Sequence, residues 1–277
     1  MSKDLFTQQS ELFSQNITKA YSTSFSAALR LININKRQDV YNIYGLVRIA
    51  DELVDTIKAK NSLDILNEFE KDTLRAMKSG ASLNPAILAF AQTARKCQIE
   101  PSLVVAFFAS MRQDINKKSY SQSEYEDYIY GSAEVVGLMC LRVFCDNNSE
   151  YIKLKKSAQA LGAGFQKVNF LRDIKDDYNN RGRTYFPDIQ YKTFSETQKK
   201  AIEKDIADDF TKALPAIKKL NTDCKYANLL AYLYYKKLLK KISHQSVEQI
   251  KTNRISVNNF YKTMLFVYVR ILKLIKI

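Results

Sequence analysis

The sequence predicts an all-α fold in which one domain of packed helices spans residues 1–277. Apolar residues recur at intervals of three and four along almost the whole chain, which is the spacing of one helix face. Glycine and proline number only 7 and 4, far fewer than a turn-rich β-fold uses. No segment reads convincingly as a strand, and no repeat or linker indicates a second domain.

The expected helices follow one another with short breaks between them. The clearest are "DVYNIYGLVRIADELVDTI" at 39–57, "AILAFAQTARKC" at 86–97 and "LVVAFFASMRQDI" at 103–115. Two longer segments follow, "EYEDYIYGSAEVVGLMCLRVFC" at 124–145 and "KLKKSAQALGAGFQKVNFLRDIKDDY" at 153–178. Turn-forming residues break the pattern near 33–37, 78–85, 100–101, 147–149, 179–183 and 221–224. We therefore expect about eight to ten helices around a shared interior.

The composition limits the kinds of chemistry and the compartment. The four cysteines form no CxxC pair, and His244 is the single histidine of the chain. The lack of such pairs disfavours a zinc site and a Ser-His or Cys-His nucleophile pair. Cysteines without a pairing pattern are typical of free thiols in a reduced compartment. The N-terminal residues contain no apolar signal-peptide core, and no run of 18 uncharged apolar residues could form a spanning helix. We expect a cytoplasmic protein.

The net charge of +14 suits an anionic partner, such as nucleic acid, an acidic membrane or a phosphorylated substrate. It is equally compatible with a general bias in the amino-acid composition of the host's proteins.

The C-terminal residues 257–277 form a basic amphipathic helix outside a core of about 17–256. Lys262, Arg270, Lys273 and Lys276 fall within about a third of the helical wheel. Two interpretations stay open. The helix caps the bundle, or residues 260–277 make peripheral contact with the inner face of an anionic membrane.

A first acidic cluster lies in "RIADELVDT". Asp51 and Asp55 project from one face of the expected helix, with Arg48 one turn upstream. Apolar neighbours make this segment half-buried, and a buried carboxylate requires a partner. Taken alone, such a pair is more typical of a solvated helix face.

A second acidic cluster forms a single polar stripe along the segment 153–178. Gln166, Asn169, Asp173 and Asp177 follow at i, i+3, i+7 and i+11, whereas Asp176 points off this stripe. Donors that are all oxygen, without histidine or thiolate, suit Mg²⁺ or Mn²⁺. Magnesium commonly bridges carboxylates to substrate phosphates.

Three arginines, Arg48, Arg172 and Arg183, are suitable bidentate partners for phosphate. The two acidic clusters with these arginines predict a helical bundle that binds a diphosphate through metal ions.

"GAGFQK" lacks the third glycine and the preceding strand of a dinucleotide loop, so we reject that interpretation. Small residues at 131, 133, 137, 162 and 164 either let helices approach closely or leave room for a long apolar ligand.

Four motifs together resemble the squalene/phytoene synthases, the head-to-head prenyl transferases of the isoprenoid synthase fold. These are "YSTSF" at 21–25, "YGLVRIADELVD" at 44–55, "YIYGSAEVVG" at 128–137 and "FQKVNFLRDIKDD" with "GRTYFP" at 165–187. The resemblance covers about 21–254 and is nearest to bacterial phytoene synthases. The chain departs from the pattern at Tyr21, where histidine is common, at Asp176, where glutamate is more usual, and in a loop one residue longer before Arg183.

The resemblance implies the site residues and the reaction. The implied metal ligands are Asp51, Asp55, Asn169, Asp173 and Asp177, holding about two to three Mg²⁺ or Mn²⁺ ions with the diphosphates. The implied catalytic residues are Arg48, Tyr128, Arg172 and Tyr185. The implied substrate-binding residues are Ser22, Thr23, Ser24, Phe25, Tyr44, Arg48, Gln166, Arg172, Arg183 and Tyr235.

The implied reaction is the 1–1′ condensation of two geranylgeranyl diphosphates to phytoene, in carotenoid biosynthesis, without NADPH. Squalene or dehydrosqualene formation from farnesyl diphosphate stays open, and squalene formation would require NADPH. A non-catalytic helical protein that binds nucleic acid, or an assembly factor, is a remote alternative. Nucleic-acid binding would give no reason for the acidic pairs, so we expect no nucleic-acid partner. An assembly factor would be expected to have lost some of the aspartates, whereas both acidic motifs are complete. The sequence makes no prediction of oligomeric state.

Overall fold

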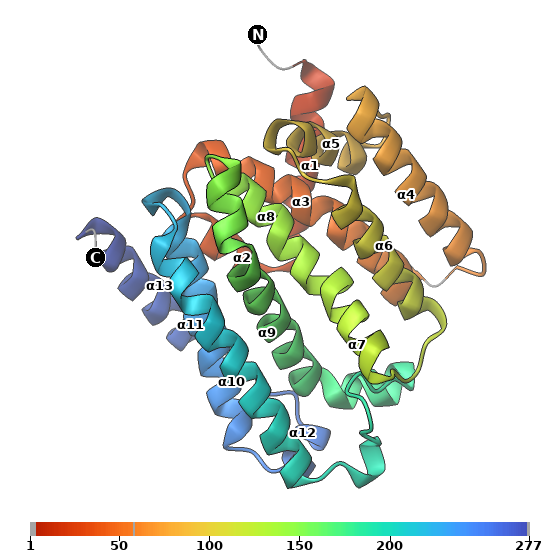
Figure 1. Cartoon of the computed structure of the whole chain (residues 1–277), viewed down its shortest axis with the longest axis vertical. Coiled ribbons are helices and arrows are strands. Elements are labelled where there is room, and N and C mark those ends of the chain that lie inside the picture. The colour runs from red at the N-terminus through yellow and green to blue at the C-terminus, as the bar shows by residue number, and fades with distance from the viewer. Residues whose placement is uncertain (1–3, 58, 276–277) are drawn as a thin grey trace.

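A computed structural model of the chain describes residues 4–57 and 59–275, and every regular element in these ranges is helical. Helices α8 (Val135–Phe144) and α9 (Asn148–Arg181) run side by side through the middle of the molecule (Figure 1). On one side lie α10 (Glu196–Lys219), α11 (Thr222–Ser243) and α13 (Asn259–Leu274). On the other lie α4 (Ser62–Ser79) and α6 (Pro101–Asn116). The predicted all-α class is confirmed.

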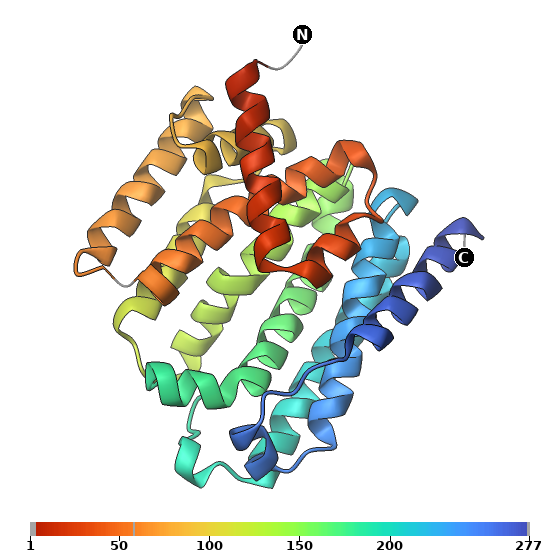
Figure 2. The ribbon, with the colours of Figure 1, turned by 180° about the vertical axis from the view of Figure 1, so that it is seen from behind.

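The remaining helices complete the bundle. Seen from behind, α1 (Leu5–Tyr21) crosses α3 (Ile34–Glu52) and packs on α5 (Pro85–Cys97) (Figure 2). The short helices are α2 (Thr23–Leu29), α7 (Gln122–Ile129), α12 (Val247–Thr252) and the 3₁₀ turn η3 (Tyr191–Thr193). The described part contains more helices than the eight to ten expected, because short helices such as α2 and α12 carry too few residues for a periodic pattern. Within the described ranges, no helix is both long enough and apolar enough to cross a bilayer.

Local sequence signals fix where helices begin and end. Ser121 accepts a hydrogen bond from the Glu124 N–H while the Glu124 side chain accepts one from the Ser121 N–H. This capping box starts α7, and α10 and α12 begin in the same way. Gly80 and Gly182 end α4 and α9 in the left-handed region, at φ 79° and 60°.

Two π-helical turns interrupt what the sequence predicts as continuous helices. The turn η1 (Leu53–Ile57) extends α3, and η2 (Tyr130–Glu134) joins α7 to α8. Such turns insert an extra residue into the helix and occur frequently at functional sites. Here η1 carries Asp55, one of the predicted metal ligands.

Glycine allows α9 to pack closely against η2 and α10. A Cβ atom on Gly162 would lie 2.8 Å from the carbonyl oxygen of Ala133, and one on Gly164 would lie 2.8 Å from the Phe210 ring. Both distances are shorter than real side chains adopt. Of the two explanations for the small residues, the structure supports close helix packing at these positions.

Two groups of buried side chains hold the helices together. One gathers around Phe90, Phe107 and Phe108 near α8, and the other around Phe170 and Phe210 near the second half of α9. Because α9 contributes to both groups, its polar face is held rigidly in the middle of the bundle.

Candidate active site

The first acidic motif lies at the end of α3. Arg48 binds two carboxylates with its two terminal nitrogens, Asp51 Oδ2 at 2.5 Å and Glu52 Oε2 at 2.5 Å. The guanidinium also lies 4.2 Å from the centre of the Tyr21 ring. Tyr21 therefore holds Arg48 by a cation–π contact.

The second acidic motif lies along α9 and is bound by two arginines. Asp173 accepts hydrogen bonds from Arg172, at 3.0 Å and 2.5 Å, and from Arg254 Nε at 2.6 Å. One turn earlier, the Tyr235 hydroxyl donates to Asn169 Oδ1 over 3.3 Å. The predicted stripe thus faces α11 and the segment that follows α12.

A single arginine joins the two acidic motifs. Arg181, in the last turn of α9, donates to Asp55 Oδ2 at 2.8 Å and lies 3.5 Å from Asp177 Oδ1. Asp55 and Asp177 are 122 positions apart in the sequence and belong to different helices, yet one guanidinium contacts both. The structure therefore brings together the two carboxylate clusters, as the sequence predicted.

The carboxylates differ in their pKa because their surroundings differ. Burial, together with the charge of Asp55, raises the pKa of Asp51 to about 6. Burial also raises the pKa of Asp177 to about 7, although Arg181 acts to lower it. Burial acts in the same direction on Asp173, but its bonds to Arg172 and Arg254 outweigh this effect and lower its pKa. The site contains more negative charge than its arginines neutralise, which suits added cations.

A buried network of side chains adjoins the second motif, where the Arg183 N–H donates to the Asp177 carbonyl oxygen at 3.0 Å. Arg183 donates to Asp114 Oδ1 at 2.5 Å and to the Tyr185 hydroxyl at 2.6 Å, and it also binds the Asp114 carbonyl oxygen. The Tyr128 hydroxyl donates to the same carboxylate, 2.8 Å from Oδ2. Burial raises the pKa of Asp114 to about 7 against the effect of Arg183.

Three predicted site residues, Tyr128, Arg183 and Tyr185, belong to this buried network. The side chain of Arg183 is 6% exposed, and Tyr128 and Tyr185 are also buried. Arg183 was predicted to bind substrate; in this structure its guanidinium is engaged with Asp114, with Tyr185 and, through Nε, with the Lys117 carbonyl oxygen at 3.2 Å. It holds the chain that leaves α9 against the end of α6.

The other predicted residues lie on helices around the acidic motifs. Ser22 caps α2 by accepting a hydrogen bond from the Phe25 N–H at 3.3 Å, with Thr23 and Ser24 in the first turn. Phe25 packs on Tyr44, with ring centres 5.2 Å apart. Tyr44 lies one turn before Arg48 on α3, so α2 is held beside the first motif.

Gln166 lies one turn before Asn169 on α9, and its amide nitrogen is 3.3 Å from the Ser132 hydroxyl of η2. The amide therefore faces η2 rather than the carboxylates. Nearby on α9, Phe165 stacks on Tyr235 with ring centres 4.1 Å apart.

Three residues contribute to this site without belonging to any of the predicted motifs. Asp114 lies alone in "MRQDINKK", where nothing near it in sequence indicates a buried partner. Arg181 lies in a segment interpreted as a break, and Arg254 belongs to a segment without a motif. The extra length of the loop before Arg183 is a signal that could have drawn attention to Arg181.

The residues present fit a hard divalent cation in their chemistry. Asp51, Asp55, Asn169, Asp173 and Asp177 supply carboxylate and amide oxygens, the ligands that Mg²⁺ prefers. Within residues 4–57 and 59–275, however, no three His, Cys, Asp or Glu side chains converge as a preformed metal site. Arginines hold the carboxylates instead, and the Arg181 guanidinium lies between Asp55 and Asp177 as a cation already in place.

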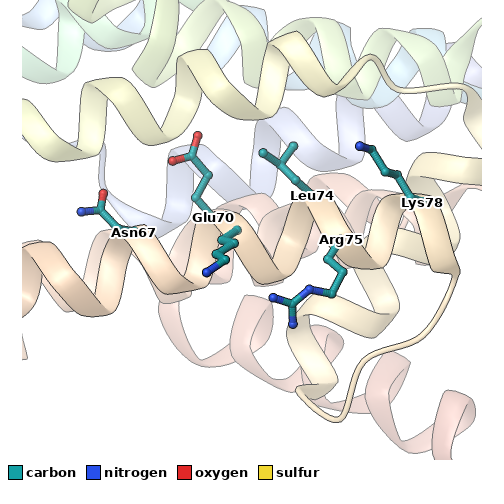
Figure 3. A pocket seen from close by; sticks show the side chains of 6 residues that line it. Asn67, Glu70, Leu74, Arg75 and Lys78 are labelled. Atoms are coloured by element: carbon teal, nitrogen blue, oxygen red, sulfur yellow. The ribbon is translucent and has the colours of Figure 1, made fainter.

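A groove of about 490 Å³ lies away from this site, on α4 (Figure 3). Its lining comes from that one helix: Asn67, Glu70, Lys71, Leu74, Arg75 and Lys78. Neither this groove nor a smaller one beside α13 contains a predicted site residue.

The helical bundle and its two facing acidic segments define an all-α protein of the isoprenoid synthase type. The pattern of the squalene/phytoene synthase family matches residues 18–260, and the chain belongs to this family of prenyltransferases. The predicted family is thus confirmed.

Individual relatives are similar but distant. A phytoene synthase of Arthrospira platensis is 25% identical over 261 residues, covering 84% of each chain. A 4,4′-diapophytoene synthase of Staphylococcus haemolyticus is 26% identical, covering 72% of this chain and 70% of that one.

Solved structures share the fold. A dehydrosqualene synthase with a bound ligand superimposes with a TM-score of 0.81 at 22% identity, over 95% of this chain and 96% of that one. The squalene synthase HpnC from Alicyclobacillus acidocaldarius gives 0.74 at 19% identity, over 87% and 95%.

Proposed function

We propose that this protein is a magnesium-dependent phytoene synthase, which joins two geranylgeranyl diphosphates head to head and releases diphosphate. The observation that carries the proposal is the contact of Arg181 with both Asp55 and Asp177. It brings two acidic motifs from distant parts of a family prenyltransferase to one place, where a diphosphate with its counter-ions would fit.

Asp51 and Asp55 on one side, and Asn169, Asp173 and Asp177 on the other, would hold Mg²⁺ or Mn²⁺. The bound ions would supply positive charge that stabilises the departing diphosphate. Burial, with a neighbouring carboxylate as a smaller cause, raises the pKa of Asp51 to about 6 and that of Asp177 to about 7; a bound cation would stabilise the charged form of both groups, which supports this assignment.

Arginines of the chain bind the diphosphate itself. Arg48 and Arg172 each present a planar guanidinium at the edge of an acidic motif, which matches the geometry of phosphate oxygens. Arg48 and Arg172 are paired with Asp51 and Asp173 in this structure, and these guanidiniums would bind the diphosphate where its counter-ions are held by the same carboxylates. No side-chain nucleophile is required, which agrees with an exposed His244.

Apolar side chains next to the acidic motifs would receive the prenyl chains. Val47 on α3, Val136 on α8 and Phe165 on α9 are half-buried and pack beside the core. Their role is to exclude water, because water would quench an allylic cation. Aromatic faces such as Tyr44 and Tyr235 would stabilise the positive charge.

The proposed reaction consists of two ionisation steps. The C–O bond of the first substrate breaks, diphosphate leaves, and the double bond of the second substrate attacks the allylic cation with loss of a proton. The resulting cyclopropylcarbinyl diphosphate loses its own diphosphate, rearranges to the 1–1′ skeleton and loses a proton to give phytoene. No reductant enters, so NADPH is not required.

The choice of a C20 substrate rests on relatives named phytoene synthase. The alternative is condensation of two C15 diphosphates, which the similarity to a 4,4′-diapophytoene synthase and the fold of a dehydrosqualene synthase favour.

Mass spectrometry of the product tests the proposal. Purified protein is incubated with Mg²⁺ and either geranylgeranyl or farnesyl diphosphate, with and without NADPH. We expect phytoene from the C20 substrate as the main product, independent of NADPH. A main product of dehydrosqualene or squalene from the C15 substrate would overturn the choice of chain length, and no hydrocarbon from either would overturn the proposed activity.

A further inference from the structure

Helix α13 exposes an apolar stripe as well as a buried one. Leu265 and Val269 face the bundle and are buried, and the helix packs on α11. The opposite face carries seven apolar side chains that are about half exposed or more: Phe260, Met264, Val267, Tyr268, Ile271, Leu274 and Ile275. Their spacing of three and four places them on one line along the helix. Figure 2 shows α13 at the edge of the molecule, with no helix on its outer side.

This apolar stripe lies in a strongly basic segment. No aspartate or glutamate follows Glu248, whereas six lysines and arginines do. Arg270 is exposed beside the stripe, and Lys273 donates to the Leu31 carbonyl oxygen at 2.6 Å. Lys276, counted in the predicted basic face, lies outside the described residues. An apolar face with cations and no carboxylates is typical of helices that lie in the surface of anionic membranes.

A small cleft at the start of α13 provides an independent observation. It encloses about 260 Å³ and is lined by Lys237, Lys241, Val257, Asn258 and Tyr261. Lys237 lies over the Tyr261 ring, 4.8 Å from its centre, and Lys241 donates to the Ser256 carbonyl oxygen at 2.6 Å. Within the described ranges, neither lysine forms an ion pair with a carboxylate, so both charges are available to an anion.

We propose that α13 docks this protein on an anionic phospholipid bilayer, with the apolar stripe at the acyl boundary and the cleft of Lys237 and Lys241 taking a lipid phosphate. The helix of 16 residues is about 24 Å long and lies parallel to the surface. Phe260, next to Tyr261 in the chain, links the stripe to the cleft. In this proposal one face of the C-terminal helix caps the bundle, as its packing on α11 shows, and the other face would meet lipid.

The charges favour a membrane over a second copy of the chain. An isologous contact through the stripe would place the same cations of two molecules, each with a net charge of +14, against one another without an acidic partner. An anionic bilayer satisfies the apolar stripe and the lysines together. A nucleic acid would satisfy the cations but leave the apolar stripe in water.

Vesicle co-sedimentation of the full chain tests the proposal. The vesicles contain phosphatidylcholine alone or with about a third phosphatidylglycerol. We expect binding to the anionic vesicles, weaker but still measurable at about 0.5 M salt, because salt screens the cations and leaves the apolar contribution. Equal binding to both vesicle types, or no binding to either, would overturn the proposal.

Two sets of variants separate the two contributions. A charge reversal such as Lys237→Glu would add repulsion from the anionic lipid to the loss of a cation. The cleft variant is therefore Lys237→Gln with Lys241→Gln. We expect roughly 25-fold weaker binding, since each cation near an anionic surface contributes about fivefold. The stripe variant combines Phe260→Ser, Ile271→Ser and Leu274→Ser, and we expect it to lose the binding that survives high salt.

A matched control replaces exposed apolar residues elsewhere. Leu63→Ser, Leu83→Ser and Ile152→Ser change side chains on other surfaces that are 43%, 93% and 62% exposed. The control should bind vesicles like the unmodified chain, and unchanged thermal unfolding of all variants shows that they fold. The proposal would be overturned in favour of a second copy if the unmodified chain did not bind vesicles, light scattering showed it to be a dimer, and the stripe variant were a monomer.

The docking proposal is independent of the proposed reaction. Prenyl diphosphate turnover in detergent should be the same for the stripe variant and the control. A protein that binds vesicles but makes no hydrocarbon would leave the docking surface intact and remove the proposed function.

Discussion

Replacing Asp114 with asparagine should destabilise the protein severely. The substitution keeps the shape of the side chain but removes the charge that faces Arg183, and both side chains are almost completely buried, at 4% and 6% exposed. Breaking a buried pair by removing one partner costs about 3–5 kcal/mol, because the other charge is left uncompensated. At about 2–4 °C per kcal/mol, Tm should fall by about 6–20 °C.

Thermal unfolding followed by circular dichroism measures this effect. The scan is run near pH 8, above the pKa of about 7 of the carboxyl group of Asp114, so that the unmodified protein carries the ion pair. The matched control is Asp205→Asn, because Asp205 is 54% exposed and its partner Lys167 keeps a second carboxylate, Asp209. The control should lose at most about 1 kcal/mol.

A double-mutant cycle tests whether the ion pair itself causes the loss. Arg183→Met combined with Asp114→Asn should cost less than the sum of the two single substitutions, because neither buried charge is left unpaired. Strict additivity, or a Tm of Asp114→Asn equal to that of the Asp205→Asn control, would show that the buried ion pair does not cause the loss.

Three further predictions concern the acidic motifs and helix packing. Arg181→Gln removes the cation shared by Asp55 and Asp177, so Mg²⁺ binding measured by calorimetry should tighten while Tm in EDTA falls; weaker Mg²⁺ binding would contradict this. Because the pKa of Asp177 is raised from 3.8 to about 7 in the folded protein, the folded state holds its proton more tightly. The Tm of the metal-free protein, compared with that of Asp177→Asn, should therefore fall as pH rises from about 4 to 7. If the Tm of the unmodified chain instead rose relative to the variant over this pH range, the prediction would be wrong. Gly162→Ala places a Cβ 2.8 Å from the Ala133 carbonyl oxygen and should cost about 1–3 kcal/mol in chemical denaturation; a stabilised variant would show that the helices can separate freely.

The sequence predicts the helices well because their signals are local. Apolar spacing indicates α3, α5, α6 and α9, and a left-handed glycine at 182 ends α9 within the expected break. The π-helical turns have no such local signal in the sequence; in the structure η2 packs against α6 and α9, and η1 contacts α6. "EYEDYIYGSAEVVGLMCLRVFC" therefore reads as one helix but forms α7, η2 and α8.

The site was only partly predictable for a related reason. The carboxylates recur at helical spacing, so Asp51 with Asp55 and Asp173 with Asp177 are visible in the sequence. Their partners are not. Arg254 meets Asp173 from 81 positions away, and no local spacing indicates such a contact. The same holds for Asp114, whose partner Arg183 is 69 positions away.

In the proposed reaction the two acidic motifs together bind and ionise a prenyl diphosphate. The most direct test measures Mg²⁺-dependent diphosphate release and hydrocarbon formation by Asp51→Asn, Asp173→Asn and, as a control, Asp176→Asn, which alters an exposed neighbour off the stripe. The prediction is that each of the first two variants loses at least about a hundredfold in rate while the control stays near the unmodified protein. Product formation at an unchanged rate by Asp51→Asn and Asp173→Asn would contradict it.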